Sequence, residues 1–160
     1  MKTTAPKRHP SSPHGTHAWL ASVQAYNLCE QVMGMRLAEI DLRVADLEVL
    51  ATLATTPGIT QQVLAARCFV TKAGVSMLLA SMEEGGLVQR DTHANDARAK
   101  CLSLTANGTA LAKKAMRIQE EVVAAMVQGA SDEEIAMLQT VMERAANQLN
   151  ALRATLAAVR

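Results

Sequence analysis

The stretch that decides the fold is residues 60–105, TQQVLAARCFVTKAGVSMLLASMEEGGLVQRDTHANDARAKCLSLT. Thr60 predicts the start of a short helix, because its hydroxyl can accept hydrogen bonds from the free amides of a first helical turn. Thr71 predicts a second helix start for the same reason, and Gly85-Gly86 ends that helix. The stretch therefore contains two successive helices joined by a short turn.

A β-hairpin is predicted to follow these helices. Residues 87–90 and 99–104 have the pattern of short extended segments, and the polar residues 91–96 join them. The hairpin tip carries Asp96 and Arg98. A helix and a flexible arm on the same side of a small domain have the geometry needed to enter a duplex groove and flank it.

The second helix has one apolar and one outward face. Its inward residues, by helical spacing, are Val75, Leu78, Leu79 and Met82. Its outward residues are Lys72, Ala73, Ser76 and Met77. In the preceding helix, Val63 and Leu64 are the expected core contacts.

The segment before this stretch predicts two further helices. Apolar residues form one stripe from His17 onward, namely Ala18, Ala21, Ala25, Leu28, Val32 and Met35. A second stripe begins with Trp19, Val23 and Tyr26, so this helix is expected to touch both its own domain and a partner chain. A second helix is expected over Arg43–Thr55, with Leu47, Leu50, Ala51 and Ala54 inward, before the Pro57-Gly58 turn.

The segment after the stretch predicts two long helices. Thr105 caps the first, which Gly129 ends. Ser131 and Glu134 form a capping box for the second. Its apolar residues repeat in steps of three and four: Ile135, Leu138, Met142, Ala145, Leu149, Leu152 and Leu156. Such a seam indicates another helix, either from a second copy of the chain or from an intrachain bundle.

These patterns predict a mainly α fold with a small β-hairpin wing. Residues 43–105 form a winged helix-turn-helix domain, and residues 15–42 and 106–160 form flanking dimerisation helices. Residues 1–14 form a flexible basic arm, whose Lys2, Lys7 and Arg8 can contact phosphate or simply be solvated.

Charge does not by itself indicate a nucleic-acid partner. The formal net charge is +1, and residues 45–105 hold five basic against six acidic side chains. A DNA-binding face must therefore arise from where the charges are placed. The three cysteines, Cys29, Cys68 and Cys101, have neither disulfide-framework nor zinc-site spacing, and there is no apolar leader or 18-residue apolar run. We expect a soluble cytoplasmic protein without a cofactor or metal.

Residues 47–112 resemble the MarR family of winged helix-turn-helix transcriptional regulators. The resemblance rests on the Asp96-x-Arg98 pair, the Leu104-Thr105-x-x-Gly108 junction and the corner at Glu84–Val88. It implies a homodimer that binds a pseudo-palindromic operator, usually as a repressor, and releases it when a small molecule binds between the winged and dimerisation domains. Arg98 matches the wing arginine that enters the minor groove, and Asp96 the acid that orients it.

Residues from three elements are candidates for DNA contact. They are Gln61, Gln62, Thr71, Lys72, Ala73, Ser76, Met77, Arg90, Asp96, Arg98 and Lys100. Gly74 and Met77 depart from the family, which commonly has Thr and Arg there. Met77 can contact a thymine methyl but cannot read guanine.

Two kinds of effector fit this scaffold. A small aromatic carboxylate, benzoate-like or hydroxynicotinate-like, suits a ring slot with a cation; the candidate residues are His14, His17, Trp19, Tyr26, Arg36 and Arg43. The simpler interpretation of the histidines is that they belong to a frayed helix start. A redox switch at Cys29 is the second kind, although the adjacent Glu30 disfavours a thiolate and a structural thiol is the simpler interpretation.

Other classes of function remain open at this point. The chain has no nucleophile–base pair, glycine-rich phosphate loop or metal-ligand spacing, so we do not expect an enzyme. A winged-helix dimerisation adaptor that binds protein instead of DNA is the alternative, because the central domain has no excess positive charge.

Overall fold

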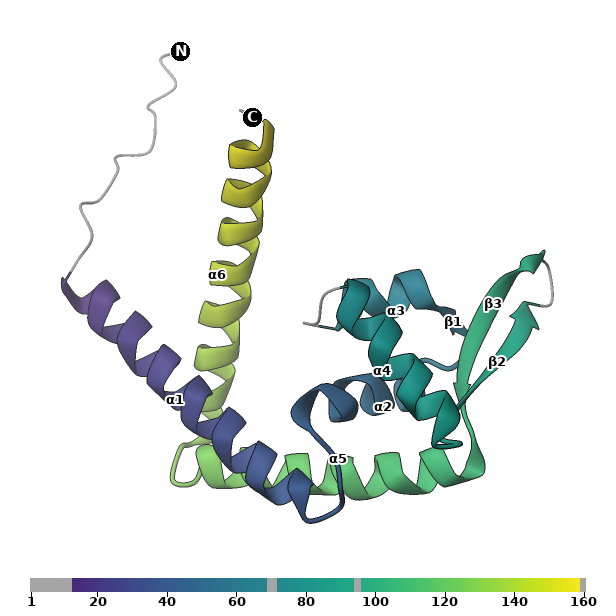
Figure 1. The fold of residues 1–160 in the computed structure, drawn as a ribbon. Helices are drawn as coiled ribbons and strands as arrows, with labels where there is room; N and C mark the ends of the chain where they lie inside the picture. Colours follow the sequence, from purple (N-terminus) through teal and green to yellow (C-terminus); the bar gives the residue numbers. More distant parts are fainter. Residues whose placement is uncertain (1–12, 69–71, 94–95, 159–160) are drawn as a thin grey trace. The chain divides into compact units, whose positions relative to one another are not determined.

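The computed structural model of the chain describes residues 13–68, 72–93 and 96–158. The elements, in chain order, are α1 (Pro13–Ala38), α2 (Val44–Thr55), β1 (Ile59–Thr60), α3 (Gln61–Arg67), α4 (Lys72–Glu84), β2 (Val88–His93), β3 (Asp96–Leu104), α5 (Ala106–Met126) and α6 (Asp132–Ala158) (Figure 1). The fold is mainly helical with one small antiparallel sheet, which confirms the predicted fold class. The N-terminal arm up to residue 12 lies outside the described residues.

The chain divides into two compact units, one up to Val123 and the other from Ala124. The first unit holds α1 through most of α5, and the second holds the end of α5 and α6. No described helix is both long and apolar enough to cross a membrane.

One aliphatic core holds the first unit together. Leu37, Leu50, Leu64, Leu79 and Leu102 are almost completely buried, and they come from α1, α2, α3, α4 and β3 respectively. Helix α5 adds Ala112, Ala115, Ile118 and Val122 to the same cluster. Interlocking aliphatic side chains therefore fix α3, α4 and the hairpin to the helices before and after them.

Helix α1 contacts this core through one of its two apolar faces. Met33 and Leu37 are buried, whereas Leu28, Val32 and Met35 are 46–72% exposed. The sequence pattern could not separate these two faces, because both are apolar.

Three smaller expectations about packing and boundaries were wrong. Helix α2 begins at Val44, with Arg43 as its N-cap residue. Ala54 is exposed and Leu53 is buried, and Val63 is 40% exposed although it was expected in the core. Helix α3 has only seven residues. Val63 and Leu64 are adjacent and lie about 100° apart around the helix axis, so Leu64 faces the core while Val63 is turned away from it.

The sheet has the order β1-β3-β2 with both pairs antiparallel. Val88 pairs with Leu104 at the base of the β2–β3 hairpin, and Ile59 pairs with Leu102. The hairpin strands extend through most of the expected polar loop, because exposed polar residues can still pair their backbones. Arg98 therefore belongs to β3 instead of the tip. Strand β1 was not predicted, since two residues carry no periodicity.

The helix caps predicted at Thr60 and Ser131 are confirmed. The Thr60 hydroxyl accepts a hydrogen bond from the Val63 amide at 3.3 Å. The Ser131 amide donates to Glu134 at 2.8 Å, and the Glu134 amide donates to the Ser131 hydroxyl at 3.3 Å. Hydrogen bonds from the backbone and the hydroxyl of Ser131 lower the pKa of Glu134.

Candidate nucleic-acid interface and effector cavity

Helix α4 presents the outward face that its sequence predicted. Val75, Leu78, Leu79 and Met82 are buried with at most 7% exposure. Ala73, Ser76 and Met77 are exposed, with Met77 at 75%. These three side chains are therefore accessible to a partner molecule.

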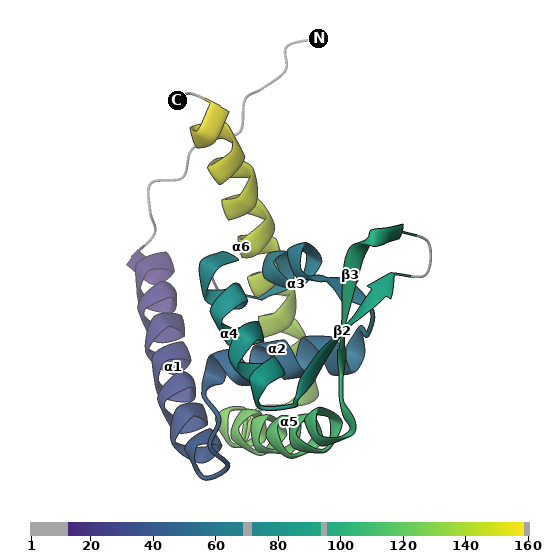
Figure 2. The same ribbon diagram turned by 45° about the vertical axis from the view of Figure 1, so that its right-hand side comes forward.

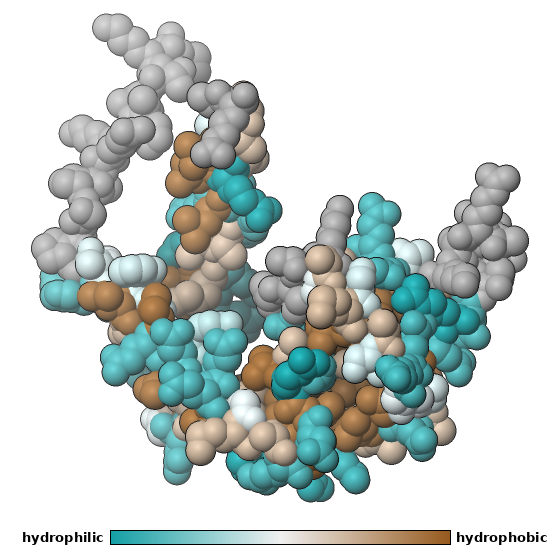
Figure 3. Space-filling model, in the orientation of Figure 1, coloured by the Kyte–Doolittle hydropathy of each residue, from teal (hydrophilic) through white to brown (hydrophobic). Residues whose placement is uncertain are grey.

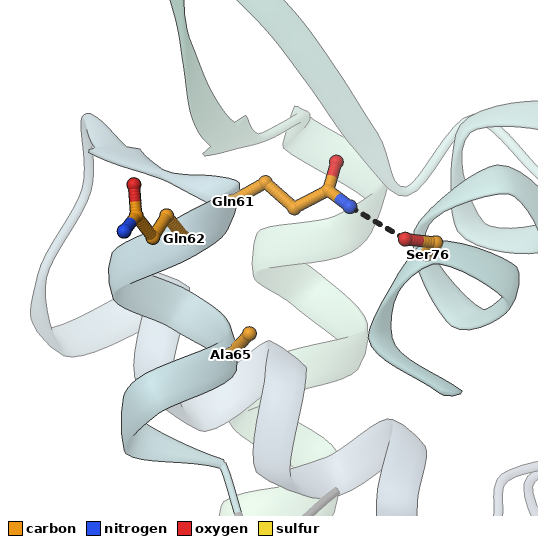
Figure 4. A pocket seen from close by; sticks show the side chains of 4 residues that line it. All are labelled: Gln61, Gln62, Ala65 and Ser76. Carbon is orange, nitrogen blue, oxygen red and sulfur yellow. Dashed lines mark hydrogen bonds between the residues drawn. The ribbon is translucent and has the colours of Figure 1, made fainter. Parts of the chain in front are cut away.

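A chain of hydrogen bonds links α3, α4 and the wing. The Gln61 amide nitrogen donates to the Ser76 hydroxyl at 2.7 Å (Figure 4). Arg90 Nη1 donates to the Gln61 amide oxygen at 3.2 Å, and Arg90 Nε pairs with Glu83 at 2.5 Å. We call these four residues the polar bridge. Three predicted DNA-contact residues, Gln61, Ser76 and Arg90, are therefore joined to one another.

A hollow of about 280 Å³ lies between α3 and α4, which pack side by side (Figures 2 and 4). Its lining residues are Gln61, Gln62, Ala65 and Ser76. Amides and a hydroxyl above a small alanine can donate to and accept from a phosphate or sugar edge. Gln62 lines this hollow next to Gln61 but on the side away from the Ser76 contact (Figure 4).

Several predicted contact residues can be placed only by their backbone. Thr71 lies outside the described residues, and so do the side chains at position 72 and at positions 92–100. Lys72 is the first residue of α4, where free helix amides favour an anion. Asp96, Arg98 and Lys100 belong to β3, the wing strand that pairs with β2.

A second cavity, of about 200 Å³, lies between α1, α2 and α5. Its lining residues are Tyr26, Cys29, Glu30, Met33, Val44, Leu47, Glu48, Ala51 and Gln119. We call it the effector cavity. Sequence reasoning missed most of this set, because the residues come from three helices and no local motif joins them.

The structure does not bring the predicted effector residues together. Tyr26 lines the effector cavity, but His14, His17 and Trp19 are exposed at the start of α1 and do not line it. A further expectation was that Arg36 and Arg43 would neutralise an effector carboxylate, and neither lines the cavity.

Both arginines are instead bound to the protein's own carboxylates. Arg36 pairs with Glu121 at 3.0 Å and with Glu39 at 3.3 Å. The Arg43 guanidinium donates two hydrogen bonds of 3.0 Å to the buried Asp46. The hydrogen bond and the charge of Asp46 raise the pKa of Arg43.

The three cysteines are free thiols. Cys29 is half-buried at the effector cavity, whereas Cys68 and Cys101 are buried. Burial raises the pKa of Cys68, the nearby charge of Glu48 adds to the rise, and the contact with the Thr52 hydroxyl opposes it. This environment suits an inert structural thiol at Cys68. Among the described residues, no group of three His, Cys, Asp or Glu side chains could hold a metal ion.

Comparison with known proteins places the chain in a family. The MarR family pattern matches residues 40–99. An uncharacterised HTH-type transcriptional regulator of Bacillus cereus is 31% identical over 102 residues, which are 64% of this chain and 67% of the relative. The chain belongs to the MarR family. It is a DNA-binding transcriptional regulator and not an enzyme.

Solved structures share the fold of this MarR-family chain. A mutant of E. coli MarR complexed with operator DNA has a TM-score of 0.70 at 18% identity, covering 84% of this chain and 99% of that one. The organohalide-sensing regulator RdhR, in its 2,4-dichlorophenol-bound form, has a TM-score of 0.71 at 17% identity, covering 91% and 89%. At these identities the likeness establishes the winged-helix fold.

Proposed function

We propose that the chain is a homodimeric repressor that binds an inverted-repeat operator and releases it when a small aromatic effector binds. The observation that carries this proposal is the exposed outer face of α4, which the polar bridge ties to the wing. The occurrence of the same fold in a complex of a MarR mutant with operator DNA supports it.

Helix α4 is the element we assign to the major groove. Ser76 can hydrogen-bond a base edge, and Met77 can contact a thymine methyl. Lys72 lies at the electropositive start of the helix. Arg98 in the wing suits a narrow minor groove of strongly negative potential.

Two copies of α4 in a dimer would read half-sites about 34 Å apart, one turn of DNA. Exposed apolar side chains on α1 and α6 supply the surface for the second copy (Figure 3). Because its target is chromosomal DNA, we place the protein in the cytoplasm.

The effector cavity is the site we assign to the small molecule. It lies between α1 and α5, which belong to the predicted dimerisation helices, and α2, which belongs to the predicted winged domain. A ligand that changes how these helices pack would move the winged domain relative to the dimerisation helices. The distance between the two α4 helices of a dimer would then no longer match the spacing of the DNA half-sites. The bound 2,4-dichlorophenol of RdhR shows that a regulator of this fold can hold one aromatic ring.

The direct test is a gel shift with the DNA upstream of the protein's own gene. We expect a specific complex, and we expect Arg98→Ala to weaken it by about 1–3 kcal/mol, the usual worth of a base-reading arginine. Arg117→Ala, on the exposed surface of α5, is the matched control and should bind like the parent. Unchanged binding by Arg98→Ala would refute the wing assignment. Absence of any specific complex would favour the adaptor alternative.

A further inference from the structure

Two contacts hold the guanidinium of Arg90 at the base of the wing. Arg90 Nε pairs with Glu83 of α4 at 2.5 Å, and Arg90 Nη1 donates to the Gln61 amide oxygen of α3 at 3.2 Å. The side chains of Arg90 and Glu83 are both 31% exposed, so dissolved ions screen this pair only in part. Arg90 therefore ties β2 to two helices at once.

The ion pair lies across the corner between α4 and the wing. The corner is formed by residues 85–87, and Gly86 makes the turn with a φ of +65°, which costs glycine little. Backbone hydrogen bonds fix the corner up to Leu87, whose amide donates to the Met82 carbonyl at 2.8 Å. Beyond the corner, the side chain of Arg90 ties β2 to the end of α4 and the start of α3.

The same contacts make Arg90 a poor candidate for a phosphate contact. Nε and Nη1 both donate to protein oxygens, so a DNA phosphate would have to compete with these acceptors for the guanidinium. The negative charge of Glu83 also offsets the positive charge through which Arg90 would attract DNA.

We infer that Arg90 and Glu83 are positioning residues that set the direction of the wing against α4, and that Arg90 is not the DNA contact expected from the sequence. The inference rests on the proposed operator binding and names two further residues on which its specificity depends. Strand β3, which carries Arg98, pairs with β2. A change in the direction of β2 therefore moves the backbone of Arg98 relative to α4.

The Arg90 contacts also reach the outer face of α4. The Gln61 amide accepts from Arg90 through its oxygen and donates to the Ser76 hydroxyl through its nitrogen, at 2.7 Å (Figure 4). The two contacts together fix the orientation of this amide. Loss of the Arg90 guanidinium would leave the amide free to turn, and Ser76, on the face that we assign to the major groove, would lose a fixed partner.

Removal of the Glu83 carboxylate separates positioning from simple charge attraction. Glu83→Ala makes the protein less negative, so attraction to phosphates alone predicts tighter DNA binding. Positioning predicts the opposite, a loss of about three- to tenfold in affinity for the DNA upstream of the protein's own gene. Glu84→Ala removes the same charge from the next residue of α4, which is exposed, and should not weaken binding. Equal or tighter binding by Glu83→Ala overturns the inference.

Substitutions of Arg90 distinguish a fork-shaped tie from a phosphate contact. Lysine keeps the positive charge and binds phosphate as a point charge, but one ammonium group cannot reproduce the separate contacts of Nε and Nη1. We therefore expect Arg90→Lys to bind the upstream DNA about three- to tenfold more weakly than the parent. Parent-like binding by Arg90→Lys overturns the inference, and so does a salt dependence in Arg90→Gln whose slope is lower by about one.

A scrambled duplex of the same length and composition separates positioning from a merely structural role. Loss of the wing position should weaken binding to the upstream DNA and leave binding to the scrambled duplex unchanged, because the latter depends on phosphate attraction. Losses in Glu83→Ala and Arg90→Gln should add up to more than the loss in the double variant, because both break the same pair. Thermal unfolding checks that each variant is folded during the binding measurement. Equal weakening on both duplexes, or fully additive losses, overturns the inference.

The parent protein on the same two duplexes separates this inference from the proposed function. If the parent does not prefer the upstream DNA, the proposed operator binding is refuted and this inference with it. If the parent has a clear preference that survives in Glu83→Ala and Arg90→Gln, the positioning role alone is refuted.

Discussion

At the scale of single residues, Gly108 joins the wing to α5. The Thr105 hydroxyl accepts a hydrogen bond from the Gly108 amide at 3.0 Å and donates to the Gly86 carbonyl at 2.6 Å. This brings the start of α5 against the backbone of Leu87. Thr105 and Gly108 were singled out from the sequence because they match a junction of the MarR family. Their contacts with the carbonyl groups of Gly86 and Leu87 could not be predicted, because these contacts form only in the folded chain.

Gly108→Ala is expected to destabilise the protein. An added Cβ would lie 1.9 Å from the Leu87 carbonyl oxygen, so the backbone would have to move. We expect a loss of about 1–3 kcal/mol or more in the free energy of unfolding, measured by urea denaturation. Gly34→Ala in α1 is the control, because its Cβ meets no atom within 4 Å, and it should gain about 0.5–1 kcal/mol. Equal stabilities of the two variants would contradict this account.

Thiol reactivity should follow burial and pKa. Burial raises the pKa of Cys68, so its thiolate is scarcer than that of an ordinary cysteine at the same pH. The folded state therefore holds this proton more tightly, and the resulting stability is lost as the pH rises through the raised pKa. With iodoacetamide at mildly alkaline pH, peptide mapping should show Cys29 modified well before Cys68. Modification of both at the same rate would mean that Cys68 is not shielded.

At the scale of elements, the polar bridge should couple α4 to the wing. Gln61→Ala removes both the contact with Ser76 and the contact with Arg90. We therefore expect weaker operator binding, by about 0.5–1.5 kcal/mol for each neutral hydrogen bond whose positioning is lost. Gln62→Ala, one residue further along α3, is the matched control and should have the smaller effect.

A double-mutant cycle distinguishes positioning by Gln61 from direct contact with DNA. If Gln61 acts through Ser76, the double variant should lose less operator affinity than the sum of the losses in Gln61→Ala and Ser76→Ala. Fully additive losses would indicate that Gln61 touches phosphate independently. Thermal unfolding of each variant checks that the affinity changes do not come from unfolding.

Elements whose contacts lie close together in the sequence could be predicted, and contacts between distant residues could not. The buried face of α4 was predicted correctly, because Val75, Leu78 and Leu79 repeat at helical spacing. The polar bridge could not be predicted, since Arg90 and Gln61 are 29 residues apart. The effector cavity could not be predicted for the same reason, because its lining residues come from three helices. Tyr26 alone was named as a candidate effector contact, because it is aromatic. A lone ring indicates a ligand contact without indicating the charge around it.

At the scale of the whole molecule, the question is what covers α6. Over its described length, Asp132–Ala158, this helix contains no buried residue. Its apolar seam is nevertheless continuous, with Leu149, Leu152 and Leu156 at 53–65% exposure. Leaving such a seam in water loses the burial of several leucines, each worth about 1.5–3 kcal/mol. We propose that a second copy of the chain covers this seam, because a dimer would also supply the two reading helices of the proposed inverted-repeat operator.

Leu149→Glu should therefore separate the dimer. A carboxylate in the centre of the seam would be buried without a partner, which costs more than the lost leucine contact alone. Sedimentation should show a dimer for the parent and a monomer for the variant at the same concentration. Asn147→Glu adds the same charge on the opposite side of α6 and should stay dimeric.

The consequence for DNA binding follows from the arrangement of the half-sites. A monomer presents one α4 and one wing, so the variant should bind an inverted repeat no more tightly than a single half-site. The parent should prefer the full repeat strongly, because the second half-site is then bound within the same complex. If Leu149→Glu is monomeric yet keeps the parent's preference for the repeat, the operator is not read by a dimer built through α6.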